Sequence, residues 1–133
     1  TTPSLEIADY AALSFSLGRP VLDGAMDLTR RIYSDFKFDP TSTDVSTPIS
    51  EVLTTRRGVC QDFAHLALAA LRAYRIPARY VSGYILTHPP PGGVRLQGAD
   101  ASHAWISVWS PEQGWVDFDP TNGIVADDEH ITV

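Results

Sequence analysis

Cys60 is the only cysteine in this chain of 133 residues, and its position favours a nucleophile. It follows Gly58-Val59, where a loop gives way to an apolar helical segment. The first N–H groups of a helix stabilise a thiolate, can lower a cysteine pKa to about 3.5–7.5, and can hold an oxyanion. Arg56 and Arg57 could add positive charge nearby, although at least one is expected to be a solvated loop charge. The alternative is a buried cysteine that packs as a small, inert hydrophobic residue.

Two predicted strands near the C-terminus, residues 103–109 and 115–119, are joined by a short loop and so form a hairpin. One register pairs Trp109 with Trp115, and a second register pairs Val108 with Gly114. Both registers place the odd-numbered residues of the two strands on one face of the sheet.

His103, Trp105, Asp117 and Asp119 therefore share a face in either register. His103 and Asp119 are direct or diagonal neighbours, with Cβ atoms about 4.5–8 Å apart, within reach of an imidazole–carboxylate hydrogen bond. Asp117 competes for the same role. We favour Asp119 because it precedes Pro120 at the end of its strand, level with the histidine.

A thiol, an imidazole and a carboxylate in this relation support nucleophilic catalysis. We expect Cys60 to be the nucleophile, His103 the base and acid, and Asp119 the group that orients the ring. Trp105, Trp109 and Trp115 are expected to pack in the core and the hairpin, and a tryptophan near the thiol could shape a substrate channel.

Residues 60–74 form the predicted central helix, which is apolar on almost every side and so gives the thiol a rigid mount. Asp62 is expected to accept hydrogen bonds from the free N–H groups of the first turn. His65 lies off the face of Cys60, and we expect a packed, hydrogen-bonded core histidine. Ile76-Pro77 ends the helix.

The other segments frame this helix. Residues 78–86 alternate as a strand, and residues 87–101, with His88, read as a loop suited to substrate contacts. Residues 38–47 read as a polar loop, and Thr47-Pro48 predicts the capped start of a short helix.

The N-terminal part carries one clear helix. Residues 1–20 are a linker with a short helix over 5–13, and residues 21–36 form an amphipathic helix. The predicted core face of that helix comprises Leu22, Ala25, Met26, Ile32, Tyr33 and Phe36.

Composition bounds the class of protein. A net charge of −6 and the lack of a basic run argue against nucleic acid as a partner. No apolar run is long enough to span a bilayer, so no membrane partner is expected. A single cysteine and four histidines show no metal-site spacing, and neither a metal nor a cofactor is expected. The compartment is left open, with the cytoplasm favoured. We interpret residues 1–133 as one domain cut from a longer protein, whose flanking domains would be partners.

Four short motifs together resemble the transglutaminase-like core, a superfamily that shares the papain-like thiol-protease arrangement, and the closest likeness is to its bacterial members. The resemblance covers about residues 21–125. The motifs are Arg57-Gly58-Val59-Cys60-Gln61-Asp62, Ile76-Pro77-Ala78-Arg79 with Val81-Ser82-Gly83, His103-Ala104-Trp105, and Gly114-Trp115 followed by Asp119-Pro120-Thr121.

The resemblance implies an α+β fold with the cysteine-bearing helix packed on an antiparallel sheet, and a triad of Cys60, His103 and Asp119. It implies acyl transfer from a polypeptide or peptide-like amide through a thioester. The acceptor is either an amine or, in a cysteine protease or amidase, water. The Cys60 N–H would hold the oxyanion, with Gln61 as a candidate second donor. A non-enzymatic binding module on the same fold is the competing class.

Overall fold

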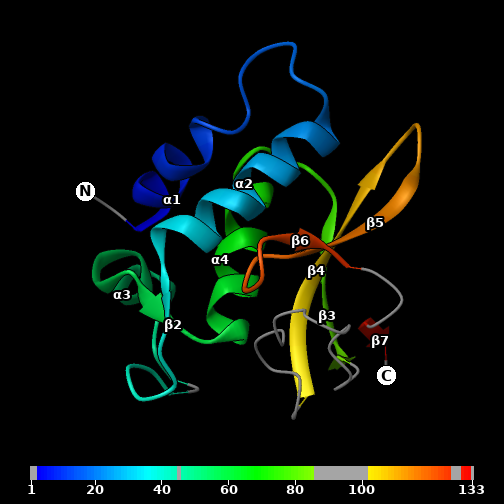
Figure 1. Ribbon diagram of the computed structural model, residues 1–133. Coiled ribbons are helices and arrows are strands. Elements are labelled where there is room, and N and C mark those ends of the chain that lie inside the picture. The colour runs from blue at the N-terminus through cyan, green and yellow to red at the C-terminus, as the bar shows by residue number, and fades with distance from the viewer. Residues whose placement is uncertain (1–2, 45, 86–101, 127–129, 133) are drawn as a thin grey trace.

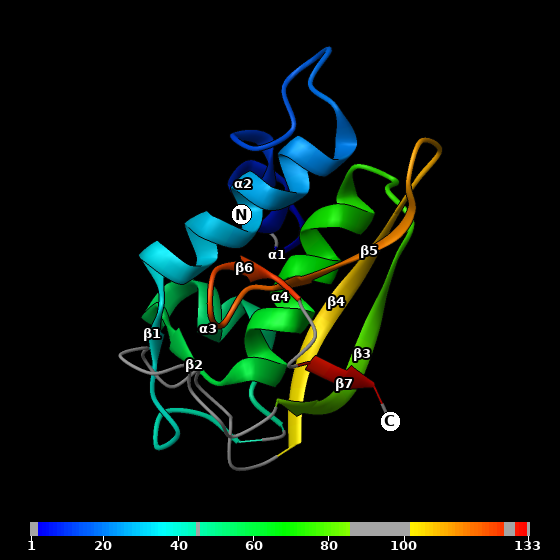
Figure 2. The same cartoon turned by 45° about the vertical axis from the view of Figure 1, so that its right-hand side comes forward.

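The computed structural model describes residues 3–44, 46–85, 102–126 and 130–132. The predicted loop over residues 87–101, with His88, lies outside the described residues. Four helices gather on one side of an antiparallel sheet (Figures 1 and 2). This is the predicted α+β arrangement.

Helix α4 (Cys60–Ala73) is the centre of the helical half. It contacts α1 (Pro3–Ala12), α2 (Val21–Asp35) and α3 (Ile49–Thr55), and it packs on the sheet. Its buried apolar side chains join one core with residues from the other helices and from two strands, among them Leu28, Ile32, Val52, Leu66, Leu71, Ile106, Val108 and Phe118. The predicted rigid mount for Cys60 is therefore present.

Two helix details differ from the sequence-based prediction. Tyr33 of α2 is 57% exposed, because the buried face instead carries Leu28 and Thr29. Pro48, in an extended conformation, is the residue that precedes the first turn of α3. Thr47 does not cap that helix, since its hydroxyl accepts the Asp44 N–H at 2.9 Å.

A short parallel ribbon joins α2 to the segment ahead of Cys60. Strand β1 (Lys37–Phe38) pairs with β2 (Arg57–Gly58), so Phe38, the first residue of the predicted polar loop over 38–47, belongs to a strand instead. The Asp39 N–H donates to the carbonyl of Gly58 at 2.8 Å. The pairing is between residues far apart in sequence, so local patterning could not reveal it. The β1–β2 pairing fixes the position of the segment that immediately precedes Cys60.

The larger sheet has the order β6-β5-β4-β3-β7. Its strands are β3 (Ala78–Ile85), β4 (Ser102–Ser110), β5 (Gly114–Asp119), β6 (Ile124–Val125) and β7 (His130–Thr132). The hairpin of β4 and β5 adopts the register that pairs Trp109 with Trp115. His103 and Asp119 are thus diagonal rather than direct neighbours.

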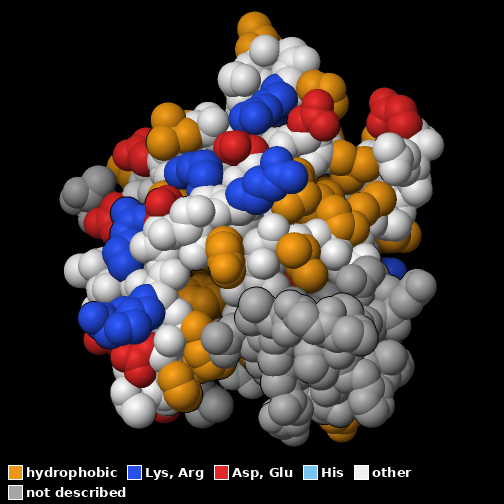
Figure 3. Space-filling model, in the orientation of Figure 1, with side chains coloured by type: hydrophobic (Ala, Val, Ile, Leu, Met, Phe, Trp, Pro, Cys, Tyr) orange, Lys and Arg blue, Asp and Glu red, His pale blue; other side chains and the backbone are white. Residues whose placement is uncertain are grey.

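On the face shown in Figure 3, Lys and Arg side chains are spread over the helical half together with Asp and Glu. No helix in the described part of the chain is long and apolar enough to cross a bilayer.

Candidate active site

Cys60 is the first residue of α4 and is partly buried. Val59, in extended conformation, precedes it, and the Phe63 N–H donates to the Val59 carbonyl at 3.1 Å. The N–H groups of Cys60 and Gln61 thus lie in the first turn, where a helix has no acceptor of its own to offer. The helix therefore points its positive end at the thiol, as the sequence predicts.

Asp62 holds this turn in shape. Its Oδ2 accepts the Val59 N–H at 2.9 Å and the Thr43 hydroxyl at 2.7 Å. The predicted hydrogen bond to the start of the helix is thus present, on the residue just before Cys60. Gly58 permits the close packing, since a Cβ there would lie 2.9 Å from Asp62 Cβ.

His103 and Asp119 form a buried pair at the other side of the site. His103 Nε2 lies 3.0 Å from Asp119 Oδ2, and both side chains are fully buried. A carboxylate only accepts hydrogen bonds, so Nε2 is the donor, and a neutral ring then has Nδ1 as its acceptor. This is the nitrogen that can take a proton from a thiol.

The turn after β5 surrounds the Asp119 carboxylate with donors. Oδ1 accepts the backbone N–H groups of Thr121 and Asn122 at 3.1 and 3.3 Å. Oδ2 also accepts the Asn122 side-chain amide at 2.8 Å. These bonds stabilise a buried negative charge and fix the direction in which it meets His103.

Asp117 has a different partner. Its Oδ2 accepts the Trp105 indole N–H at 3.0 Å. Trp105 is completely buried and its ring lies 6.0 Å from that of His103. Trp105 therefore packs in the core beside the histidine, as the sequence predicts, rather than lining an open substrate channel. Trp109 and Trp115 are 40% and 45% exposed, so they do not belong to the core.

The pKa of His103 reports on both of its neighbours. Burial lowers the pKa, but the hydrogen bonds and negative charges of Asp119 and Cys60 outweigh burial and raise it to about 9. The structure therefore brings Cys60, His103 and Asp119 together, with the imidazole between the sulfur and the carboxylate. The raised pKa favours the protonated imidazolium in this environment.

The two arginines near the cysteine have other partners. Arg57 pairs with Asp39 at 3.2 Å. The Arg56 guanidinium lies 5.0 Å from the centre of the Phe36 ring and 5.3 Å from that of Tyr10. Both arginine side chains therefore contact groups other than the Cys60 thiol.

His65 is exposed, which corrects the predicted core histidine. It stacks on Tyr80 of β3, with ring centroids 4.9 Å apart. Gln61, His65 and Arg72 form an exposed polar stripe at helical spacing, a signal that the apolar content of α4 obscured. Burial and the charge of Cys60 raise the pKa of Tyr80, so this tyrosine lies within electrostatic range of the thiol.

Two hollows flank the first turn of α4. A hollow of about 260 Å³ is lined by Gln61, Asp62 and His65 together with Asp44, Thr47, Ile49 and Tyr80. A second hollow of about 570 Å³ is lined by Phe63 and Thr121 together with Ile32, Tyr33, Ser34, Phe36, Lys37 and Phe38. Gln61 is thus exposed beside the nucleophile candidate. Among the described residues, no three His, Cys, Asp or Glu side chains gather in a way that could hold a metal.

A protein-family model described as the transglutaminase-like superfamily matches residues 11–120 of this chain. The chain belongs to that superfamily. An uncharacterized protein of Mycobacterium bovis is 50% identical over 131 residues, which cover 96% of this chain and 42% of the relative. A protein-glutamine gamma-glutamyltransferase of Pseudomonas aeruginosa is 44% identical over 68 residues, half of this chain and 10% of that protein.

Solved structures agree with this membership in the transglutaminase-like superfamily. A candidate cysteine protease from Cytophaga hutchinsonii superposes with a TM-score of 0.78 at 30% identity, over 98% of this chain and 41% of that one. The chain thus spans about two fifths of the length of its mycobacterial relative and of this structural neighbour.

Sequence reasoning missed Asn122 and Tyr80. Asn122 follows Asp119-Pro120-Thr121, and an Asx residue after a proline is a common turn signal, so its contact with the carboxylate was accessible in principle. Tyr80 lies on a different strand from His103 and carried no local signal. Only the packing of β3 on α4 brings it near the thiol.

Proposed function

We propose that this domain catalyses cysteine-dependent acyl transfer on amide substrates, with Cys60, His103 and Asp119 as its triad. The observation that carries the proposal is the buried imidazole held between the Asp119 carboxylate and the Cys60 thiol. Membership in the transglutaminase-like superfamily supports it.

The reaction follows from these positions. The thiol proton moves to Nδ1 of His103, and the sulfur attacks the carbonyl carbon of an amide. The oxyanion forms near the N–H of Cys60 at the start of α4. Collapse of the tetrahedral intermediate breaks the C–N bond, and the imidazolium gives its proton to the departing amine. Throughout, Asp119 holds the ring and stabilises its positive charge.

The resulting thioester passes to a primary amine, which regenerates the thiol and completes a transamidation. The glutamine transferase from Pseudomonas aeruginosa supports this acceptor. Hydrolysis is a second candidate, favoured by the likeness to the candidate cysteine protease over nearly the whole chain. The two differ only in whether an amine or water attacks the thioester.

Alkylation of the single thiol by iodoacetamide tests the triad directly. A His-activated thiolate should react rapidly below about pH 7 in the parent, and the rate should fall in His103→Ala. A rate that rises only near pH 8.5 in both proteins, as for a free thiol, would contradict the proposal. Such a result would favour the non-enzymatic binding module.

Turnover distinguishes the two acceptors. Glutamine peptides are incubated with and without a fluorescent primary amine, and both amine incorporation and free acid are measured. Incorporation supports transfer, whereas free acid at the same rate with or without amine supports hydrolysis. Cys60→Ala and His103→Ala should abolish either product while the circular dichroism spectrum is unchanged, and retained turnover in either variant would refute the triad.

A further inference from the structure

Tyr80 has a fixed place between the sheet and the first turns of α4. It pairs with Ile106 in the β3–β4 register, and Ile106 packs in the core that α4 shares with the sheet. Directly paired residues of antiparallel strands share a face, so the Tyr80 side chain also lies on the face that α4 covers. Its ring stacks on that of His65, with the two planes 21° apart. This contact holds the tyrosine against the helix that carries Cys60.

The hollow of about 260 Å³ extends from Tyr80 to the residues that directly follow Cys60. Gln61 and Asp62, the second and third residues of α4, line it together with His65 and Tyr80. Tyr80 is 37% exposed, and its hydroxyl makes no hydrogen bond to any other described residue. The phenol is therefore available as a donor at the end of α4 that carries the thiol.

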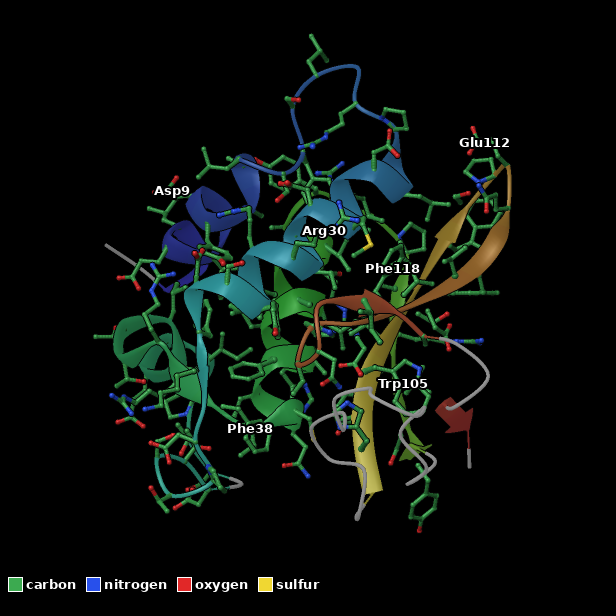
Figure 4. The ribbon with its side chains drawn as sticks, viewed as in Figure 1. Asp9, Arg30, Phe38, Trp105, Glu112 and Phe118 are labelled. Atoms are coloured by element: carbon green, nitrogen blue, oxygen red, sulfur yellow. The ribbon has the colours of Figure 1, made fainter. Side chains whose placement is uncertain are left out.

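The neighbouring strand β4 relates Tyr80 to the triad. In Figure 4, Trp105 lies on β4 next to the lower end of α4, where the helix begins at Cys60, and its ring packs beside that of His103. Val81 of β3 pairs with Trp105, so Tyr80 is one residue away from this level of the sheet. Burial and the charge of Cys60 raise the pKa of Tyr80, so the phenol oxygen lies within electrostatic range of the sulfur.

The proposed reaction needs donors at this place. Attack on an amide moves negative charge from the sulfur to the carbonyl oxygen, which is bonded to the carbon that the sulfur joins. The oxyanion therefore develops beside the sulfur, within range of the groups that sense the thiolate charge. The Cys60 N–H supplies one donor. His103 supplies none, because its Nε2 donates to Asp119 and its Nδ1 carries the thiol proton. A tyrosine hydroxyl is among the side-chain donors that complete such oxyanion holes.

Two side chains that line the hollow could supply the second donor, Gln61 and Tyr80. Gln61 is exposed, and no hydrogen bond to another described residue fixes its amide. Tyr80 has a short list of rotamers and is held by its stacking on His65. A donor that is fixed before the reaction needs no reorganisation in the transition state, which favours Tyr80. Its raised pKa also keeps the proton on the hydroxyl at neutral pH, as a donor requires.

We propose that the Tyr80 hydroxyl is the second donor of the oxyanion hole and acts together with the backbone N–H of Cys60. The inference rests on the proposed acyl-transfer function. It makes Tyr80 a catalytic residue, because its hydroxyl contacts the reacting carbonyl oxygen, and it leaves Gln61 as a wall of the hollow.

Two reagents that modify Cys60 separate the oxyanion hole from the activated thiol. With 4-nitrophenyl acetate, the sulfur attacks the ester carbonyl and an oxyanion forms; its collapse breaks the C–O bond, 4-nitrophenolate leaves, and an acetyl thioester remains. With iodoacetamide, the sulfur displaces iodide from a saturated carbon and no oxyanion forms. The acylation rate divided by the alkylation rate of the same protein therefore reports the oxyanion hole.

Tyr80→Phe removes the hydroxyl and keeps the ring that stacks on His65. It should lower this rate ratio about tenfold, and kcat/KM for amine incorporation into glutamine peptides about 10²-fold, while alkylation stays within about twofold of the parent rate. Tyr74→Phe is the matched control, because Tyr74 is 38% exposed, follows the other end of α4, and packs its ring on Phe15. It should keep the parental values of all three. Urea unfolding verifies that each variant is folded.

A parental rate ratio in Tyr80→Phe would overturn the assignment and leave the proposed function standing, and a loss in Gln61→Ala alone would give the second donor to Gln61. Rapid alkylation of the parent, with acylation no faster than that of a free thiol, would contradict an oxyanion hole and Tyr80 with it. Slow alkylation of the parent below about pH 7 would instead contradict the activated thiol, and the proposed function itself.

Discussion

Replacing Asp119 by asparagine is the sharpest perturbation that the site offers. Among the described residues, the carboxylate accepts hydrogen bonds from His103, from the Thr121 N–H and from two groups of Asn122. An asparagine has one acceptor oxygen, and its NH₂ group must face either His103 or the backbone donors. Facing His103, it favours the tautomer with the proton on Nδ1, which cannot accept a proton from the thiol. Facing the backbone, the NH₂ group opposes the N–H groups of Thr121 and Asn122, which are also donors.

The expected loss can be estimated from these two effects. A wrong tautomer and the loss of the charge that stabilises the imidazolium should lower kcat/KM about 10³-fold, equivalent to about 4 kcal/mol of transition-state stabilisation. Leaving one or two buried donors unpaired should lower the free energy of unfolding by about 1–3 kcal/mol at pH 6. Both quantities are measurable on the same preparation, by amine incorporation and by urea unfolding.

Asp117→Asn is the matched control, because the Asp117 carboxylate accepts the Trp105 N–H and an amide oxygen can replace that acceptor. It should retain kcat/KM within about threefold of the parent value. The reasoning fails if Asp119→Asn keeps comparable activity, or if Asp117→Asn is equally damaging.

Three further predictions concern pH and two glycines. The pKa of His103 is about 9 in the folded protein and 6.5 ordinarily, so its contribution to stability should be complete below about pH 6.5 and lost as the pH rises through about 9. Activity should decline over the same upper range as the imidazolium loses its proton, which the pH dependence of kcat/KM in the parent protein measures. Urea unfolding across pH measures the stability, and a His103→Ala variant that keeps the parental loss of stability up to about pH 9 would argue against this assignment. Gly58→Ala should displace Asp62, which lies 3.0 Å or less from the added Cβ, and should lower both the melting temperature and the alkylation rate of Cys60; a parental rate would show that the turn tolerates the methyl group. Gly123 has a φ of +69°, and a Cβ added there would lie 2.7 Å from Tyr33 Cγ. Gly123→Ala should therefore lower the free energy of unfolding by about 1 kcal/mol or more, measured by urea unfolding. A stability equal to that of the parent would contradict this reasoning.

Some features of the site needed only local information. A glycine before a lone cysteine at the head of an apolar run predicts a thiol at a helix N-terminus, because turn chemistry and helical periodicity act over a few residues. The two-residue period of strands placed His103 on the face of Asp117 and Asp119 in either register. The choice between the two carboxylates then rested on Pro120, and the structure pairs His103 with Asp119 and Trp105 with Asp117.

Other features exist only through contacts between distant segments. The β1–β2 ribbon, the stacking of His65 on Tyr80 and the two hollows each join residues separated along the chain by an intervening helix or loop. Amphipathic patterning says which residues are apolar but not which neighbour covers them, so His65 was assigned to the core and Tyr33 to a buried face. The sequence by itself determined the chemical groups and the elements that carry them. Tertiary packing decided which of those groups meet, because register, helix docking and the Asn122 turn set distances that no local pattern encodes.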